Sequence, residues 1–123
     1  MTKRSLVCIV DDNEAVRESL PDLVQYGGYD VQTFASAEDF LASSAVEDAA
    51  CLILDVGLPG MSGPDLHKEL QRRGRACPVV FITAQGDRSL PARLVAEGAV
   101  ACLLKPFGDA VLLEALHRAC GRS

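Results

Sequence analysis

Chemically active side chains stand at the ends of four apolar runs in this sequence. Asp11 and Asp12 follow the first run, Asp55 follows the third, and Lys105 follows the last. The fourth run ends in the hydroxyl-bearing Thr83. If these runs are strands of one parallel sheet, their ends lie at a common edge and bring carboxylates, a hydroxyl and an ammonium group together.

Three carboxylates held close together would repel one another strongly, so their pKa values must shift or a cation must bind. Hard oxygen ligands without neighbouring His or Cys favour Mg²⁺ (or Mn²⁺), which typically takes one or two carboxylates, water and phosphate oxygens. Such an ion would also offset the charge of an incoming phosphoryl group. Together with the ammonium of Lys105 and the hydroxyl of Thr83, this set is suited to forming an acyl phosphate on an aspartate.

The apolar runs that must position these groups have the length and composition of strands. They lie at Ser5–Val10, Val31–Phe34, Cys51–Leu54, Val79–Thr83 and Val100–Leu104. Their continuous rather than alternating apolarity predicts strands covered on both faces, as in a parallel sheet. Right-handed crossovers then place all the carboxyl ends of the strands on one edge.

Helical patterns separate the strands and predict an α/β fold of five βα units. They span Glu14–Tyr26, Ser36–Ala42, Pro64–Arg73, Pro91–Glu97 and Asp109–Cys120. Four of them end at glycine, which tolerates the left-handed conformation that follows many helices. Ser36, with Asp39 three residues later, is close to a capping box. Pro21 lies inside the first pattern and should kink or loosen that helix.

Composition and length indicate a single globular domain over residues 1–123. Apolar residues make up 49% of the chain and charged residues 24%. No apolar stretch approaches the roughly 20 residues that cross a bilayer, and the run after Arg4 is too short for a signal peptide, so a cytoplasmic protein without membrane contact is expected. The net charge of −5 disfavours nucleic-acid binding by these residues themselves.

The cysteines and histidines are interpreted as structural. None of the five cysteines is spaced as Cys-x-x-Cys, and three lie among Val, Ile and Leu, which indicates small buried hydrophobic residues. Zinc binding or a disulfide remain alternatives. His67 and His117 lie in helical patterns and are expected to be surface or structural residues.

The arrangement resembles the receiver domain of bacterial two-component response regulators over essentially the whole chain. Four motifs carry the resemblance: Val10-Asp11-Asp12, Leu54-Asp55-Val56-Gly57-Leu58-Pro59-Gly60-Met61-Ser62-Gly63, Ile82-Thr83-Ala84 and Lys105-Pro106-Phe107. The second motif is highly specific, whereas the first and last are weak alone. The sequence of the loop after Asp55, together with Gly98-Ala99 ahead of the last apolar run, is most similar to the FixJ/NarL-type branch. The resemblance implies a doubly wound, flavodoxin-like (βα)5 fold with strand order 2-1-3-4-5.

The resemblance also implies residue roles. Asp55 would accept a phosphoryl group from a phosphohistidine on a sensor histidine kinase or a phosphotransfer protein. Asp12, Asp55 and the backbone carbonyl of Gly57 would bind Mg²⁺ directly, and Asp11 would act through water. Thr83 would bind oxygens of the phosphoryl group.

Five further positions complete the implied site. Lys105 would bind phosphoryl oxygens with Thr83, and the small Ala84 would leave access for the phosphoryl group. Pro59 and Gly60 would shape the loop after the phosphoacceptor. Pro106 would hold the last loop, where the family's peptide bond is usually cis.

The sequence departs from the family pattern at the position three residues before the lysine. Receivers usually carry Tyr or Phe there, and its ring moves inward when the threonine closes on the phosphate. Here the residue is Cys102, which cannot fill that space. Gly57 and Gln85 hold positions that tune dephosphorylation in the family, and the glycine offers no side chain for this.

Alternatives remain open at this point. Asp11 or Asp12 could cap the first helix, and Asp55 could be a turn residue. A phosphatase of the haloacid dehalogenase type also uses an Asp nucleophile with Mg²⁺, and a degenerate receiver could act as a phosphate sink or an interaction module. The resemblance further implies a phosphorylation-dependent homodimer through the fourth helix, fifth strand and fifth helix. An output domain, often DNA-binding in this branch, could lie outside this chain.

Overall fold

The computed structural model describes residues 4–75, 77–84 and 88–121. Strands and helices alternate along the described chain. In order they are β1 (Leu6–Val10), α1 (Glu14–Tyr26), β2 (Asp30–Phe34), α2 (Ala37–Leu41), α3 (Ala45–Asp48), β3 (Ala49–Asp55), α4 (Gly63–Arg72), β4 (Val79–Thr83), α5 (Leu90–Ala96), β5 (Ala101–Leu104) and α6 (Asp109–Ala119).

The five strands form one parallel sheet in the order β2-β1-β3-β4-β5, which confirms the predicted fold and strand order. The three inner strands are almost fully buried, as their continuous apolarity predicted, whereas the edge strands β2 and β5 are partly exposed. The pairing of Val10 with Leu54, and of Asp55 with Ile82, brings the carboxyl ends of the inner strands level with one another.

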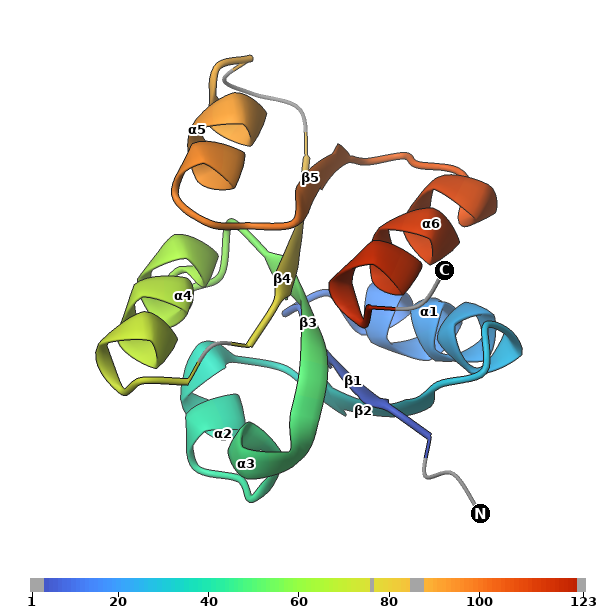
Figure 1. Ribbon diagram of the computed structural model, residues 1–123, viewed down its shortest axis with the longest axis horizontal. Helices are drawn as coiled ribbons and strands as arrows, with labels where there is room; N and C mark the ends of the chain where they lie inside the picture. Colours follow the sequence, from blue (N-terminus) through green and yellow to red (C-terminus); the bar gives the residue numbers. More distant parts are fainter. Residues whose placement is uncertain (1–3, 76, 85–87, 122–123) are drawn as a thin grey trace.

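Helices cover both faces of the sheet and divide the core into two clusters. Helices α1 and α6 lie on one face, and α2, α3, α4 and α5 lie on the other (Figure 1). The first cluster includes Val24, Ile53 and Leu116, and the second includes Phe40 and Leu66. Packing on both faces holds the central strands rigidly, so the residues at their ends have a firm support.

The structure differs from the sequence-based expectation mainly around residue 45. The short helix α3 was not predicted, and β3 begins at Ala49, two residues before the expected Cys51. A four-residue helix is too short to show a helical period, and its preceding residue, Ser44, makes no side-chain capping hydrogen bond. Helix α1 runs through Pro21, and the kink or loosening expected there stays a prediction.

The cysteines of the chain are free thiols. Cys8 and Cys51 are buried, as expected, while Cys77, Cys102 and Cys120 are only partly buried. Burial is the main reason that the pKa of Cys8 rises to about 12 and that of Cys77 to about 11. These thiols are therefore protonated near neutral pH, which suits their interpretation as packing residues.

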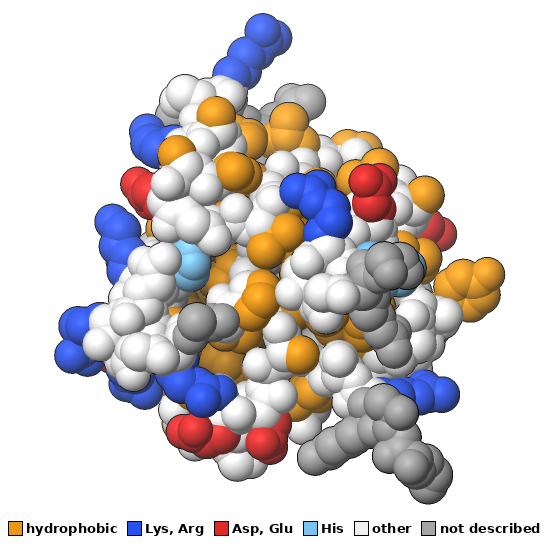
Figure 2. All heavy atoms as spheres, viewed as in Figure 1, with side chains coloured by type: hydrophobic (Ala, Val, Ile, Leu, Met, Phe, Trp, Pro, Cys, Tyr) orange, Lys and Arg blue, Asp and Glu red, His pale blue; other side chains and the backbone are white. Residues whose placement is uncertain are grey.

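Lys and Arg side chains gather over α4, at the left of Figure 2. Two of them, Arg72 and Arg73, make ion pairs with Glu69 at 2.6 and 2.7 Å. His67 on the same helix is buried and packs edge-on against Phe81, so it is a structural residue rather than a surface one. Among the helices that the structure describes, none combines the length and apolar character of a membrane span.

Candidate phosphoryl-acceptor site

Asp11 is held rigidly at the end of β1. Its N–H donates to the carbonyl of Phe34 at 3.1 Å, and its side chain is fully buried. One carboxylate oxygen accepts from the N–H of Asn13 at 2.8 Å, and the other accepts from Nζ of Lys105 at 3.2 Å. A buried carboxylate needs such partners, because burying an unpaired charge is costly.

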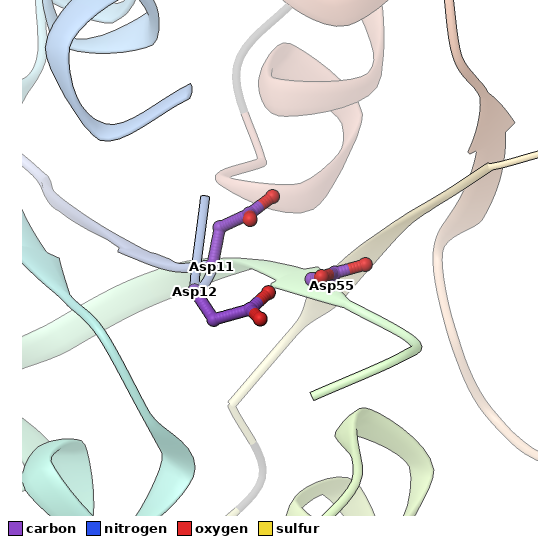
Figure 3. Close-up of side chains that lie close together, drawn as sticks. All are labelled: Asp11, Asp12 and Asp55. Atoms are coloured by element: carbon purple, nitrogen blue, oxygen red, sulfur yellow. The ribbon is translucent and has the colours of Figure 1, made fainter. Parts of the chain in front are cut away.

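The three predicted carboxylates meet at the carboxyl edge of the sheet. Asp11 and Asp12 extend from the end of β1 and Asp55 from the end of β3 (Figure 3). Each offers an oxygen, and these oxygens lie within 4.8 Å of one another. Asp55 is 8% exposed, whereas Asp12 is open to solvent. Oxygen ligands at this spacing fit a hard divalent cation.

The alternative that Asp11 or Asp12 caps the first helix is wrong. The N-cap of α1 is Asn13, whose side-chain oxygen accepts from the N–H of Ala15 at 2.9 Å. Because Asn13 performs the capping, neither aspartate is needed for it. Asn is one of the preferred N-cap residues, so its place just before the helical pattern was the signal that sequence reasoning missed.

The pKa of the Asp55 carboxyl is raised above its usual range. Burial is the largest cause, and the negative charge of Asp11 adds to it, with a smaller contribution from Asp12. The positive charge of Lys105 and a hydrogen bond from the N–H of Gly57 at 3.3 Å act in the opposite direction. The cluster therefore carries uncompensated negative charge that a cation would relieve.

Residues at and beyond the carboxyl ends of β1, β3, β4 and β5 line one cavity of about 570 Å³. The lining comprises Asp11, Asp12, Asn13, Asp55, Val56, Gly57, Thr83, Ala84, Leu90 and Lys105. The structure thus brings every predicted metal-binding and phosphoryl-binding residue to one pocket. Leu90, the first residue of α5, was not predicted, because an apolar residue at a helix start carries no chemical signal.

The hydroxyl and ammonium groups in this cavity have partners within the protein. Thr83 Oγ1 donates to the carbonyl of Ala84 at 3.0 Å. Lys105 Nζ donates to Asp11, and the Lys105–Pro106 peptide bond is cis. The hydroxyl of Thr83 has a single proton, so it would have to release this carbonyl to donate to a ligand, whereas the ammonium of Lys105 has three N–H donors and could keep Asp11.

The loop between β3 and α4 places Gly57, Pro59 and Gly60 beyond the phosphoacceptor candidate. Gly60 has a φ of +70°, which favours glycine. Gly63 begins α4 and packs directly on the backbone of Asp55, since a Cβ there would lie 2.3 Å from the Asp55 carbonyl oxygen. Sequence reasoning included Gly63 in a motif but did not find this contact, which depends on how the loop closes.

Cys102 occupies the position where an aromatic residue was expected. It pairs with Phe81 across β4 and β5, and its thiol is partly buried against the α4 side of the core. Burial raises the pKa of this thiol. Gln85, the other position linked to dephosphorylation, lies outside the described residues.

Comparisons with known proteins agree with this geometry. Residues 7–117 match the model of the response regulator receiver domain. Nodulation protein W of Bradyrhizobium diazoefficiens is 40% identical over 119 residues, covering 97% of this chain and 52% of that protein. The transcriptional regulatory protein FixJ of Azorhizobium caulinodans is 40% identical over 117 residues, covering 95% of this chain and 56% of that protein. The chain therefore spans about half the length of these relatives.

A solved receiver structure superposes on this chain over almost its whole length. The crystal structure of FixJ-N superposes with a TM-score of 0.85 at 35% identity, covering 99% of this chain and 98% of that one. Similarity to these FixJ-type proteins also agrees with the branch suggested by the loop sequence. The chain belongs to the response regulator receiver domain family of two-component signalling systems, in its FixJ/NarL-type branch.

Proposed function

We propose that this domain is a phosphorylation-activated switch and that Asp55 is its phosphoacceptor. In the reaction, an oxygen of the Asp55 carboxylate attacks the phosphorus of a phosphohistidine on a sensor histidine kinase or phosphotransfer protein. The new O–P bond replaces the P–N bond, and the imidazole leaves with its electron pair and takes up a proton. The single observation that carries this proposal is the convergence of three carboxylate oxygens within 4.8 Å.

The residues of the cluster fit Mg²⁺ (or Mn²⁺). Asp12, Asp55 and the carbonyl of Gly57 would bind the ion directly, and Asp11 through water. The fit rests on the donor set, because the cavity lining has carboxylate and carbonyl oxygens but neither His nor Cys. A bound Mg²⁺ supplies positive charge that stabilises the transferred phosphoryl group.

Thr83 and Lys105 would bind the oxygens of the transferred phosphoryl group. Lys105 already lies in the cavity with its ammonium 3.2 Å from Asp11. Thr83 would release the carbonyl of Ala84 and turn its hydroxyl toward the phosphoryl group. Ala84 has only a methyl group, which leaves room for the ligand. Both donors stabilise negative charge on the phosphoryl oxygens.

Phosphorylation would change the conformation of the face formed by α5, β5 and α6. Val95, Leu104 and Val111 are exposed hydrophobic residues on these elements, which supports a phosphorylation-dependent homodimer through this face. Light scattering before and after addition of beryllofluoride tests this, and an unchanged mass contradicts it.

Cys102 bears on how the site communicates with this face. In one hypothesis, movement of Thr83 alone reshapes the face of α5, β5 and α6. In the other, phosphorylation is only weakly coupled to this face, and the domain acts as a phosphate sink or a binding adaptor. NMR of the free and beryllofluoride-bound forms distinguishes these. Changes confined to the cavity favour weak coupling, and equal coupling in a Cys102→Phe variant contradicts a role for this position.

The whole protein would be a cytoplasmic transcriptional regulator. Relatives of which this chain covers 56% and 53% are named as transcriptional regulatory proteins. Residues 1–123 would form its receiver domain, with an output domain in the longer protein. The net charge of −5 favours the view that the receiver itself does not bind DNA.

Incubation with acetyl phosphate and Mg²⁺ tests the phosphoacceptor assignment against its rivals. One phosphate per chain, detected by intact mass and absent in Asp55→Asn, is the expected result. The matched control is Asp22→Asn, which changes an exposed aspartate on α1 and should be phosphorylated normally. Multiple turnover without a stable adduct would support a phosphatase, although the adjacent Asp11 and Asp12 lack the Asp-x-Asp spacing of that class. No modification would support an interaction module.

A further inference from the structure

The loop that follows Asp55 is fixed at both of its ends by backbone hydrogen bonds. At its start, the N–H of Val56 donates to the carbonyl of Ile82 at 3.0 Å. At its end, the N–H of Gly63 donates to the carbonyl of Val56 at 3.2 Å. The segment between these anchors contains Gly57, whose carbonyl belongs to the proposed metal site, and Gly60. Glycines leave a loop many conformations, so the end anchors alone do not fix it.

A further anchor holds this loop at Met61, two residues before its end, and it comes from a different part of the chain. The N–H of Met61 donates to Oε2 of Glu38 at 2.9 Å. Glu38 lies in the first turn of α2, 23 residues earlier. The same hydrogen bond is the largest reason that the pKa of the Glu38 carboxyl lies below its usual value.

Helix α2 is built so that Glu38 stays in this position. Ser36 caps the helix by accepting from the N–H of Asp39 at 3.0 Å. Phe40 is buried in the core and packs edge-on against Phe34 of β2, with ring centroids 5.4 Å apart. The capped start and the buried ring fix the short helix on the sheet, so Glu38 projects from a firm support.

The loop fits closely around the Glu38 carboxylate. At Gly60, which has a φ of +70°, a Cβ would lie 2.7 Å from Oε2 of Glu38. A side chain at this position would be strained at this φ and would displace the flexible end of Glu38 from its present place. The neighbouring Met61 side chain is packed against the core below. The hydrogen bond lies at the surface, and the fit of Gly60 around the carboxylate and the packing of Met61 accompany it.

We infer that Glu38 is a positioning residue for the metal site, holding the loop so that the Gly57 carbonyl is ready to bind Mg²⁺. This inference rests on the proposed function, which assigns that carbonyl to the metal. Without the anchor, the loop samples more conformations, and ordering it on binding costs affinity. A single backbone hydrogen bond lost in this way corresponds to a decrease in Mg²⁺ affinity of about three- to ten-fold.

The test is a comparison of Mg²⁺ affinities by titration calorimetry without any phosphodonor. Glu38→Ala removes the anchor and should weaken binding about three- to ten-fold. Glu38→Gln keeps an oxygen that can accept from Met61 and should stay within about two-fold of the parent protein. The matched control is Asp39→Ala, which removes an equal charge one residue away and should also leave the affinity unchanged within about two-fold.

An NMR measurement locates the effect. The amide resonances of Met61 and Gly57 should shift in Glu38→Ala and stay close to their parent positions in Glu38→Gln. If Glu38→Ala does not fold, Glu38→Asp replaces it, because the shorter side chain withdraws the acceptor from Met61 and should likewise weaken Mg²⁺ binding. Unchanged affinity in the folded variant, or an equal loss in Asp39→Ala, overturns the inference.

The design separates this inference from the proposed function. If the parent protein binds Mg²⁺ but Asp55 is not phosphorylated, the phosphoacceptor assignment fails while the affinities still test Glu38. If the parent protein binds no Mg²⁺, both fail together. If phosphorylation proceeds normally and Glu38→Ala binds Mg²⁺ like the parent, only the inference about Glu38 fails.

Discussion

Replacement of Asp55 by Asn should stabilise the metal-free protein. Oxygens of Asp11, Asp12 and Asp55 lie within 4.8 Å of one another. Two unit charges at that distance repel by about 3.5 kcal/mol at an effective dielectric constant of about 20. The ammonium of Lys105 offsets part of this repulsion, and solvent screens the exposed Asp12. We therefore expect a net gain of about 1 kcal/mol in the free energy of unfolding, or roughly 5 °C in Tm.

The assay is thermal unfolding of the parent protein and Asp55→Asn in chelator-treated buffer, followed by addition of Mg²⁺. At a concentration about ten times its Kd, Mg²⁺ should stabilise the parent by about 1.4 kcal/mol. The variant, which lacks one carboxylate ligand, should gain much less. Asp22→Asn serves as the control, since it removes an exposed charge on α1 and should respond to Mg²⁺ like the parent.

The pH dependence of unfolding gives an independent check that the charge of Asp55 lowers the stability of the metal-free protein. The pKa of Asp55 is raised in the folded protein, so the folded state holds this proton more tightly than the unfolded state does. The charged Asp55 therefore lowers the stability of the parent above the folded pKa, and this loss disappears as the pH falls toward the ordinary aspartate pKa of 3.8. The advantage of Asp55→Asn should shrink in the same range. A variant that is less stable than the parent at neutral pH without metal would refute the reasoning.

Three further predictions concern residues around the site. Gly63→Ala should destabilise the fold by about 2 kcal/mol or more in urea denaturation, because its Cβ would lie 2.3 Å from the Asp55 carbonyl oxygen; unchanged stability would contradict the tight contact. Lys105→Met should cost about 1–2 kcal/mol of stability by leaving the buried Asp11 without its cation, and it should abolish NMR changes on adding beryllofluoride; a full response would contradict the role of the ammonium. Burial lowers the pKa of His67, so the stability that its neutral form provides is present above the ordinary histidine pKa of 6.5 and is lost as the pH falls below it; His67→Leu should flatten this decline in urea titrations from pH 7 to pH 5.

The sequence was sufficient to predict the sheet and the residues at its carboxyl edge. Continuous apolar runs identified the inner strands, because those strands are buried on both faces. Asp11, Asp55 and Lys105 each follow such a run, so a parallel topology was enough to bring them into one cavity. These inferences need only periodicity and connectivity, both of which are local properties of the sequence.

The features that escaped prediction depend on distances between segments far apart in the chain. The contact of Glu38 with Met61 joins residues 23 positions apart. The packing of Gly63 on the carbonyl of Asp55 depends on how tightly the loop closes. Helix α3 spans too few residues to show a period, so it could be found only from the packed structure. Residue types alone do not specify such distances.

The ion pair between Lys105 and Asp11 has a consequence for the order in which ligands reach the cavity. In the metal-free protein the ammonium already neutralises part of the acidic cluster, at 3.2 Å from Asp11. A divalent cation bound beside Asp11 would repel that ammonium and weaken its interaction with the carboxylate. The ammonium would then be freer to turn toward an arriving phosphoryl group. On the proposed function, metal loading and readiness for the phosphodonor would be coupled through one lysine, which would serve as an internal counterion until magnesium takes its place.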